Sequence, residues 1–404
     1  MPNPIENKNI VLGVSGSIAC HKAVDLSSKL VQQGAVVDVI MTRGAANFVT
    51  PLAFQAITHR PVICDMSDPK SEMAMDHLAM AERANIVVVA PATANTIGRL
   101  AYGLADDALT TTALATRAPI IICPAMDGYM FENPATQENI QRLESRGCLV
   151  AGPVEGRMAS GLVGKGRLLE VPEIIGHIRK VLGRTEDLAE HKVVVSAGGT
   201  QEAIDPVRFI SNRSSGKMGY AIAEAARDRG AEVVVVAAPG AQTDPAGIRV
   251  RHVVSAEDMR GAVVEECHDA DVLIMAAAVA DWRPVEKAVN KLKKGSLEHV
   301  SVELTRTPDI LRSVRGRNLI RVGFAAESEN LETNASAKLK DKELHLVVAN
   351  DITSEESGFG SDNNRVLLLD QDGTVEQLPL MPKYDVGQRI LDFVVRLLHK
   401  SNQA

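Results

Sequence analysis

Short runs of apolar, mostly β-branched residues recur along this 404-residue chain, and a segment with helical periodicity follows most of them. The runs do not alternate apolar with polar residues, as they would in a strand with one solvated face. Continuous apolar runs are typical of a parallel sheet that helices cover on both faces. The strand candidates of the first half are 9–16, 35–42, 85–93, 119–126 and 148–153, with helices at positions such as 18–33 and 134–146. This alternation predicts a doubly wound α/β sheet.

The same alternation starts again after a charged segment at 182–192. The strand candidates of the second half are 192–200, 232–239, 271–280, 319–327 and 345–351, with helices near 217–230, 255–268 and 330–341. We therefore predict two doubly wound parallel-sheet domains, at 1–184 and 185–404. The length of the chain suits such a division, because domains commonly have ~100–200 residues.

Composition narrows the classes of function. The net charge of −7 and the 3% content of aromatic residues argue against a nucleic-acid partner, which needs a basic surface and stacking platforms. No apolar run approaches the ~18 residues that span a bilayer, and the N-terminal segment lacks the pattern of a signal peptide. The five cysteines are scattered without CxxC spacing, which fits a reducing compartment and argues against a cysteine-based zinc site. We expect a cytoplasmic protein with no membrane partner.

Two strand ends of the first half carry short polar turns. The turn at 15–19 offers two hydroxyls and the N–H groups of a helix start, and the turn at 93–96 is rich in hydroxyl and amide groups. Ligands of open α/β sheets bind beyond the carboxyl ends of the strands, and helix N-termini suit phosphates. We therefore predict a mononucleotide site, although an ordinary βα turn is the alternative for 15–19 alone. The GxGxxG fingerprint is missing, which disfavours an NAD-dependent oxidoreductase.

Three further features of the first half are ambiguous. The segment 156–167, GRMASGLVGKGR, has four glycines and three cationic residues around Ser160. Such a composition is typical of a linker, but it also suits a mobile flap over an anion site. Asp127 follows a strand candidate directly. His77 stands beside a carboxylate near a helix start, where a lone histidine is more often structural than catalytic.

The second half has its own polar strand ends. Ser211, Asn212, Ser214, Ser215 and Gly216 come just before a predicted helix. Their polar groups and the helix N–H groups converge on one point, which indicates a phosphate site, with a generic N-cap loop as the alternative. A strand of small residues ends at Asp281 beside the only tryptophan, and a lysine cluster follows at 290–295. Such a cluster is usually a solvated charge run, but here it is a candidate triphosphate contact.

Taken in order, these motifs resemble a known family. SGSIA, MTRGAANFVTPLAFQ, DHLAMA, APATANT and PAMDGYM resemble the flavin-dependent cysteine decarboxylases. ISNRSSGKMG, AAAVADWRP, NKLKKG, TPDIL, VGFAAE and AND resemble a phosphopantothenate–cysteine ligase. From residue 8 to about residue 398, the chain resembles the bifunctional phosphopantothenoylcysteine decarboxylase/phosphopantothenate–cysteine ligases of coenzyme A biosynthesis. The resemblance implies a flavodoxin-like first domain and a Rossmann-like second domain.

For the first domain, the resemblance implies an FMN-dependent decarboxylase. The FMN contacts would come from Ser15, Gly16, Ser17, Thr42, Thr93 and Asn95. His77 would act on the substrate thiol. Two positions depart from the family pattern, because Ser160 replaces the flap cysteine that protonates the enethiolate and Asp127 replaces an asparagine that contacts the substrate carboxylate. We expect Asp127 to bind the substrate and the proton to come through Ser160 or water.

For the second domain, the resemblance implies activation of 4′-phosphopantothenate by CTP in the presence of Mg²⁺, followed by attack of the cysteine amine. Asn212 would hold the acyl-cytidylate. The nucleotide contacts would be Ala276, Ala277, Asp281, Lys291, Pro308, Asp309, Ile310, Phe324, Lys338 and Lys342. No protein cage for a metal is visible in the sequence, so the metal ligands are unknown, and Mg²⁺ held largely by phosphates and water suits this pattern. The resemblance also implies a homo-oligomer.

Two alternatives remain for the first domain. It could be an altered decarboxylase that releases the unreduced enethiol, since Ser160 and Asp127 both depart from the family pattern. It could instead be a flavin-binding assembly or regulatory module attached to an active ligase. The complete coenzyme A role, with 4′-phosphopantetheine as the product, is the leading hypothesis.

Overall fold

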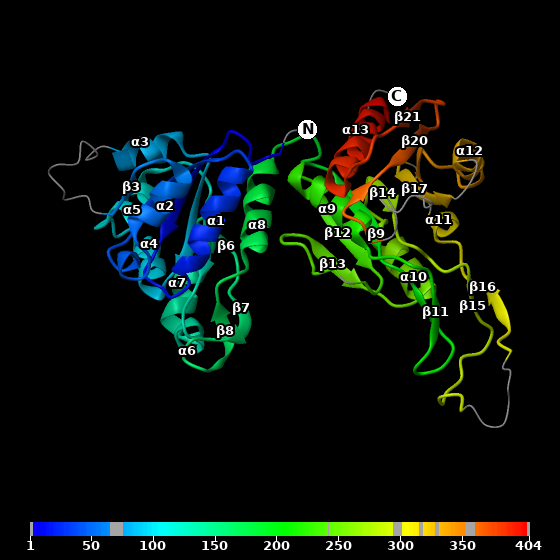
Figure 1. The fold of residues 1–404 in the computed structure, drawn as a ribbon, viewed down its shortest axis with the longest axis horizontal. Coiled ribbons are helices and arrows are strands. Elements are labelled where there is room, and N and C mark those ends of the chain that lie inside the picture. The colour runs from blue at the N-terminus through cyan, green and yellow to red at the C-terminus, as the bar shows by residue number, and fades with distance from the viewer. Residues whose placement is uncertain are drawn as a thin grey trace. The chain divides into compact units, whose positions relative to one another are not determined.

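The computed structural model describes residues 3–64, 76–240, 242–293, 301–314, 318–327, 331–351 and 360–401. The chain divides into two compact units, Met1–Leu182 and Gly183–Ala404 (Figure 1). Within the described residues, none of the helices has both the length and the apolar content that crossing a membrane requires.

The first unit is built on a six-stranded parallel sheet of order β3-β2-β1-β4-β5-β6. The strands are β1 (Asn9–Val14), β2 (Val36–Met41), β3 (Val62–Ile63), β4 (Ile86–Ala92), β5 (Ile120–Pro124) and β6 (Leu149–Val150). The helices are α1 (Cys20–Gln32), α2 (Pro51–Thr58), α3 (Asp76–Arg83), α4 (Ala94–Tyr102), α5 (Ala108–Ala115), α6 (Gly128–Glu132), α7 (Pro134–Ser145) and α8 (Val171–Gly183), and a 3₁₀ turn spans Ala45–Asn47.

Helices cover both faces of this sheet, which explains the continuous apolar runs. Ile10 and Leu12 of β1 pack into one core with Leu26 of α1, while Val11, between them, packs into a second core with Ile97 of α4. The predicted doubly wound sheet is confirmed. The chain reverses direction across the sheet between β1 and β4, and ligands of such sheets bind at the carboxyl ends next to this switch point.

The second unit repeats this order and extends it. Its sheet runs β13-β12-β9-β14-β17-β18-β20-β21, with the first six strands parallel and the last two antiparallel. The strands are β9 (Lys192–Ala197), β12 (Glu232–Ala237), β13 (Arg249–His252), β14 (Val272–Met275), β17 (Ile320–Glu327), β18 (Leu346–Asp351), β20 (Val366–Asp370) and β21 (Val375–Gln377). The helices are α9 (Lys217–Asp228), α10 (Ala256–Glu266), α11 (Ile310–Ser313), α12 (Leu331–Asp341) and α13 (Lys383–Ser401). The predicted Rossmann-like architecture is confirmed, with an antiparallel edge added.

Short antiparallel pairs carry the segments that surround the sheets. In the first unit, β7 (Val154–Arg157) and β8 (Val163–Arg167) form a hairpin, so the glycine-rich segment 156–167 is an ordered flap and not a linker. In the second unit, β10 (Gln201–Ala203) pairs with β11 (Phe209–Ser211), β15 (Trp282–Pro284) with β16 (Leu304–Arg306), and β19 (Asn363–Asn364) with β22 (Met381–Pro382).

Candidate functional site

Ser15 ties together the two polar turns at the switch point of the first unit. Its side chain is buried, and its Oγ donates to the carbonyl of Pro91 at 2.8 Å and accepts from the backbone N–H of Thr93 at 2.9 Å. Thr93 in turn caps α4 by accepting from the N–H of Thr96. Because the Ser15 hydroxyl already donates its proton to Pro91, we assign Ser15 the structural role of holding the two turns together and not a direct contact with a ligand.

The two turns line a cavity of about 600 Å³ at the carboxyl end of the sheet, a size that suits a cofactor. Of the residues predicted to contact FMN, Gly16, Thr42, Thr93 and Asn95 line it. Gly16 lets the turns after β1 and β2 approach closely, because a Cβ there would lie 2.8 Å from the carbonyl carbon of Gly44. The hydroxyl groups, the N-terminus of α4 and this close approach fit the phosphate and flat ring of FMN.

Ser17 lines a neighbouring cavity of about 410 Å³, which the flap closes on one side. Asp127 and Ser160, which lie 33 residues apart in the sequence, both line this cavity and contact each other. Ser160 Oγ donates to Asp127 Oδ2 at 2.6 Å, and Asp127 Oδ1 accepts from the N–H of Tyr129 at the start of α6. The two departures from the family pattern therefore form one hydrogen-bonded pair.

The base of the flap packs against the turn after β5. The N–H of Met126 donates to the carbonyl of Gly166 at 3.0 Å. A Cβ at Gly166 would lie 2.3 Å from the carbonyl oxygen of Met126, so this position requires glycine.

Sequence reasoning missed Lys22, which reaches the 410 Å³ cavity from the first turn of α1 and forms an ion pair with Glu170 at 2.8 Å. The hydrogen bond from Lys22 lowers the pKa of the Glu170 carboxyl, although burial acts to raise it.

His77 belongs to α3 by its backbone, but its side chain lies outside the described residues. Met130, one turn beyond Asp127, is half-exposed and lines the larger cavity. Of the predicted residues of this site whose side chains are described, all except Ser15 line one of two neighbouring cavities, and Ser15 is buried behind them.

In the second unit, the polar loop before α9 lines a cavity of about 550 Å³. Asn212 fixes one wall, because its Nδ2 donates to the carbonyl of Val279 at 2.9 Å in the segment after β14. Ser214, Ser215 and Gly216 line the same cavity at the start of the helix, together with Ala276. This arrangement offers an amide group and a helix N-terminus to an anionic substrate.

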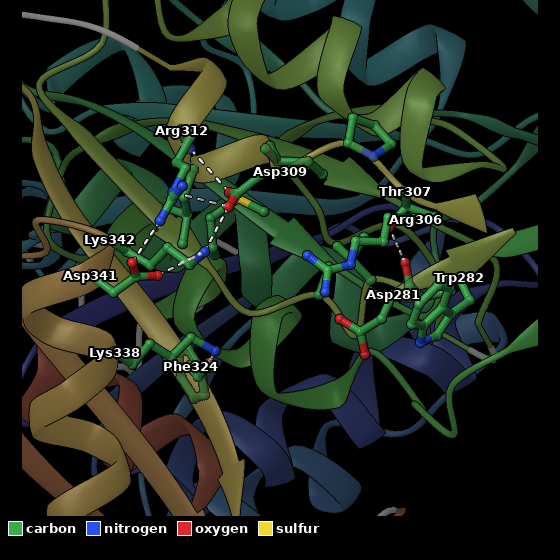
Figure 2. A pocket seen from close by; sticks show the side chains of 17 residues that line it. Asp281, Trp282, Arg306, Thr307, Asp309, Arg312, Phe324, Lys338, Asp341 and Lys342 are labelled. Atoms are coloured by element: carbon green, nitrogen blue, oxygen red, sulfur yellow. Dashed lines mark hydrogen bonds and ion pairs between the residues drawn. The ribbon is translucent and has the colours of Figure 1, made fainter.

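A larger cavity of about 750 Å³ adjoins it (Figure 2). The predicted nucleotide contacts that line it are Ala277, Asp281, Pro308, Asp309, Ile310, Phe324, Lys338 and Lys342. The two cavities share Ala277, Val279, Asp281, Phe324 and Lys338. Two ligands bound in them would therefore meet beside Lys338, whose Nζ donates to the carbonyl of Phe324 at 2.6 Å.

A network of ion pairs closes one side of the larger cavity, as Figure 2 shows. Lys342 Nζ donates to Asp309 Oδ2 at 2.7 Å, and Arg312 pairs with Asp341 at 2.6 Å. Partial burial acts to raise the pKa of Asp309, yet the hydrogen bonds from Lys342 and from the Arg312 N–H lower it overall. The hydrogen bond to Asp309 raises the pKa of Lys342. Both groups therefore stay charged at neutral pH, and Lys342 lies where a phosphate could attract it.

Lys291 lines neither of these cavities in the described residues. The segment around it is held by its neighbour Leu292, whose N–H donates to Asp205 Oδ2 and whose carbonyl accepts from Arg208. The rest of the predicted lysine cluster, from residue 294, lies outside the described residues. The role of Lys291 remains a prediction.

Sequence reasoning missed three residues that line the 550 Å³ cavity of the second unit. Lys217 and the buried Lys383 hold the segment 360–363 through its carbonyls, and burial together with repulsion from Lys217 lowers the pKa of Lys383. Asn350 Oδ1 is buried and meets no donor within the described parts of the chain, so it is available to a ligand. The AND motif could have indicated Asn350. Lys383, at the start of a terminal helix, carries no such signal.

For the residues with described side chains, no group of three His, Cys, Asp or Glu residues could hold a metal ion.

Comparisons with known proteins match both units. The Flavoprotein family model matches residues 1–183, and the model of the DNA/pantothenate metabolism flavoprotein C-terminal domain matches residues 188–398. The "Coenzyme A biosynthesis bifunctional protein CoaBC" of Bacillus subtilis (strain 168) is 44% identical over 404 residues, and that of Escherichia coli (strain K12) is 41% identical, in both cases over 99% of either chain. The crystal structure of the C-terminal domain of a CoaBC protein is 39% identical and covers 54% of this chain and 100% of its own, with a TM-score of 0.46.

Proposed function

Because the chain belongs to the family of bifunctional coenzyme A biosynthesis proteins and carries both the decarboxylase and the ligase domains, we propose that the two activities divide between its two units. The second unit ligates 4′-phosphopantothenate to cysteine, and the first decarboxylates the product to 4′-phosphopantetheine. The observation that carries this division is that each unit has its own pair of ligand-sized cavities at the carboxyl ends of its parallel strands.

The ligation follows from the two adjoining cavities of the second unit. A carboxylate is a poor acyl donor, so its oxygen first attacks the α-phosphorus of CTP and pyrophosphate leaves. We assign CTP to the larger cavity and 4′-phosphopantothenate to the smaller one, so that the reacting groups meet beside Lys338. Lys338 and Lys342 stabilise the phosphate charge, and Mg²⁺ is expected to bind mainly to the phosphates.

The second step of ligation forms the amide. The amine of cysteine attacks the acyl carbon, and CMP leaves. Asn212 is the residue that we assign to holding the acyl-cytidylate, because its amide lies at the edge of the smaller cavity next to the shared wall formed by Val279. Asn350 lines the same cavity, and its buried Oδ1 accepts no hydrogen bond from the described residues.

Lys291 provides a test of the nucleotide assignment. We expect Lys291→Gln to reduce pyrophosphate release from CTP by about 10²-fold, because a charged donor to the triphosphate is lost. Lys400→Gln is the matched control, since it removes the same charge from an exposed lysine of the second unit that pairs with Asp372 and lines neither cavity. Equal rates for the two variants and the wild type would remove Lys291 from the nucleotide site.

The first unit is the flavoprotein half, and FMN is its cofactor. We propose that Gly16, Thr42, Thr93 and Asn95 hold FMN in the larger cavity of that unit. FMN supplies a hydride acceptor and donor for the substrate carbon that carries the thiol. His77 acts on the thiol, Asp127 binds the carboxylate that is lost, and the proton that replaces it reaches the substrate through Ser160 or a water molecule.

Purified protein is therefore expected to be yellow and to release FMN on denaturation, because the turns hold the flavin without a covalent bond. Absorbance spectra before and after denaturation and ultrafiltration measure this. Colourless protein that fails to take up added FMN would contradict the assignment of the first unit.

We also propose a cytoplasmic homo-oligomer that assembles partly through the second unit. Its hairpins β10–β11 and β15–β16 lie side by side and extend from the sheet (Figure 1). They expose Val207, Phe209, Trp282 and Leu304, each at least 40% accessible. Large apolar side chains gathered on one projecting surface favour burial against a second copy of the chain.

A further inference from the structure

The tip of the flap is joined to the rest of the first unit by the Ser160–Asp127 hydrogen bond. Within the described residues, the other hydrogen bonds of this turn are its own backbone bonds, Met158 N–H to Leu162 O and Gly161 N–H to Met158 O, and the Met158 side chain lies beside Gly128 of α6. Among the described residues, the bond from Ser160 is the side-chain hydrogen bond that connects this turn to α6. We propose that Asp127 and Ser160 act as one unit, a latch that closes the flap over the smaller cavity and fixes the direction of the Ser160 hydroxyl.

The chemistry of the two side chains explains why they belong together. Both oxygens of Asp127 are used, since Oδ1 accepts from the Tyr129 N–H at 3.1 Å and Oδ2 accepts from Ser160 at 2.6 Å. An asparagine has one acceptor oxygen. If that oxygen kept the Tyr129 N–H, the amide would turn an N–H toward Ser160 and make the hydroxyl an acceptor. A carboxylate at 127 therefore matches a hydroxyl donor at 160.

The latch also has a consequence for the substrate. Both side chains line the cavity that the flap closes. An anionic substrate that enters this cavity must therefore compete with Asp127 for the hydrogen bond that the Ser160 hydroxyl donates. Before substrate binds, Asp127 positions the Ser160 hydroxyl in the closed flap, and it can reach the substrate carboxylate only once that hydrogen bond opens. The assignment of this cavity to the decarboxylase substrate rests on the proposed function, but the latch itself does not.

Hydrogen–deuterium exchange of the full chain with its bound FMN tests the latch without any substrate. We expect Ser160→Ala and Asp127→Ala each to speed exchange in residues 156–167 by about three- to ten-fold, the effect of losing one hydrogen bond. The double variant should exchange no faster than either single variant, because each removes the same bond. Ser160→Thr keeps the hydroxyl and should exchange at the wild-type rate.

Asn133→Ala is the matched control for loss of a helix cap. Asn133 caps α7 by accepting from the Ala135 N–H at 3.0 Å, as Asp127 caps α6, but it makes no hydrogen bond to the flap in the described structure. Its variant should leave flap exchange unchanged. Additive effects in the double variant, or wild-type exchange in both single variants, would overturn the latch. Because product formation is not the readout, failure of the decarboxylase assignment would leave this result intact.

Discussion

Replacing Asn212 with aspartate is expected to reduce ligation by about 10²- to 10³-fold, the usual effect of losing one donor to a developing charge. The Asn212 amide now donates to the carbonyl of Val279 at 2.9 Å, on the wall shared by both cavities of the second unit. A carboxylate has the same size but no N–H, so an oxygen would face the Val279 carbonyl. It would also add a negative charge beside an anionic acyl-cytidylate.

Two controls make this result specific. Mass spectrometry of the ligated product measures the loss, while decarboxylation of supplied 4′-phosphopantothenoylcysteine should proceed at the wild-type rate. Gln371→Glu adds the same charge to an exposed turn of the second unit that lines neither cavity, and it should ligate normally. Normal ligation by Asn212→Asp would remove Asn212 from the site.

Gly16→Ala is expected to cost the first unit its flavin. The new Cβ would lie 2.8 Å from the Gly44 carbonyl carbon, and backbone atoms cannot rotate away as a side chain can. The turn after β1 and the turn after β2, which both line the 600 Å³ cavity of the first unit, must then move apart. Overpacking of this kind costs ~1–3 kcal/mol, which corresponds to about a 5- to 150-fold loss of FMN affinity. Decarboxylation should fall with the flavin content, and ligation should not.

Gly98→Ala is the matched substitution. Gly98 lies on α4 close to the same site, but a Cβ there would meet nothing nearer than the Asn139 side chain at 3.5 Å. Alanine in a helix is also favourable relative to glycine. Titration with FMN, followed by absorbance, should therefore separate the two variants. Wild-type flavin binding by Gly16→Ala would show that the close approach of the turns is not needed.

The sequence predicted the fold best where burial dictates residue type. Strands covered on both faces, such as β4 and β9, must be continuously apolar, and that pattern is visible without a structure. Edge strands do not need a continuously apolar sequence, so this pattern does not reveal them. β13 reads Arg249–His252 and carries charge because it lies at the edge of the sheet, and the antiparallel pair β20–β21 follows no strand–helix alternation.

The candidate sites show the same division. Parallel strands bring their carboxyl ends to one edge of a sheet, so the sequence could predict that Thr93 lies near Gly16, whereas the grouping of Asp281 with Phe324 came from the family resemblance. It could not predict the contact between Ser160 and Asp127, because that contact depends on how the β7–β8 hairpin folds back onto α6. Lys383 reaches its cavity from a distant terminal helix, where a lysine is normally solvated.

The mass of the final product tests the central claim most directly, which is that one chain carries out both reactions in full. Purified protein with 4′-phosphopantothenate and cysteine, with and without CTP, is the complete experiment. We predict 4′-phosphopantetheine, the saturated thiol, with CTP and no product without it. A product lighter by two hydrogens as the sole outcome would mean that Ser160 and Asp127 do not support the reductive step. Ligated acid that keeps its carboxyl group, in protein that carries FMN, would instead show a flavin module attached to a working ligase, and would contradict the account.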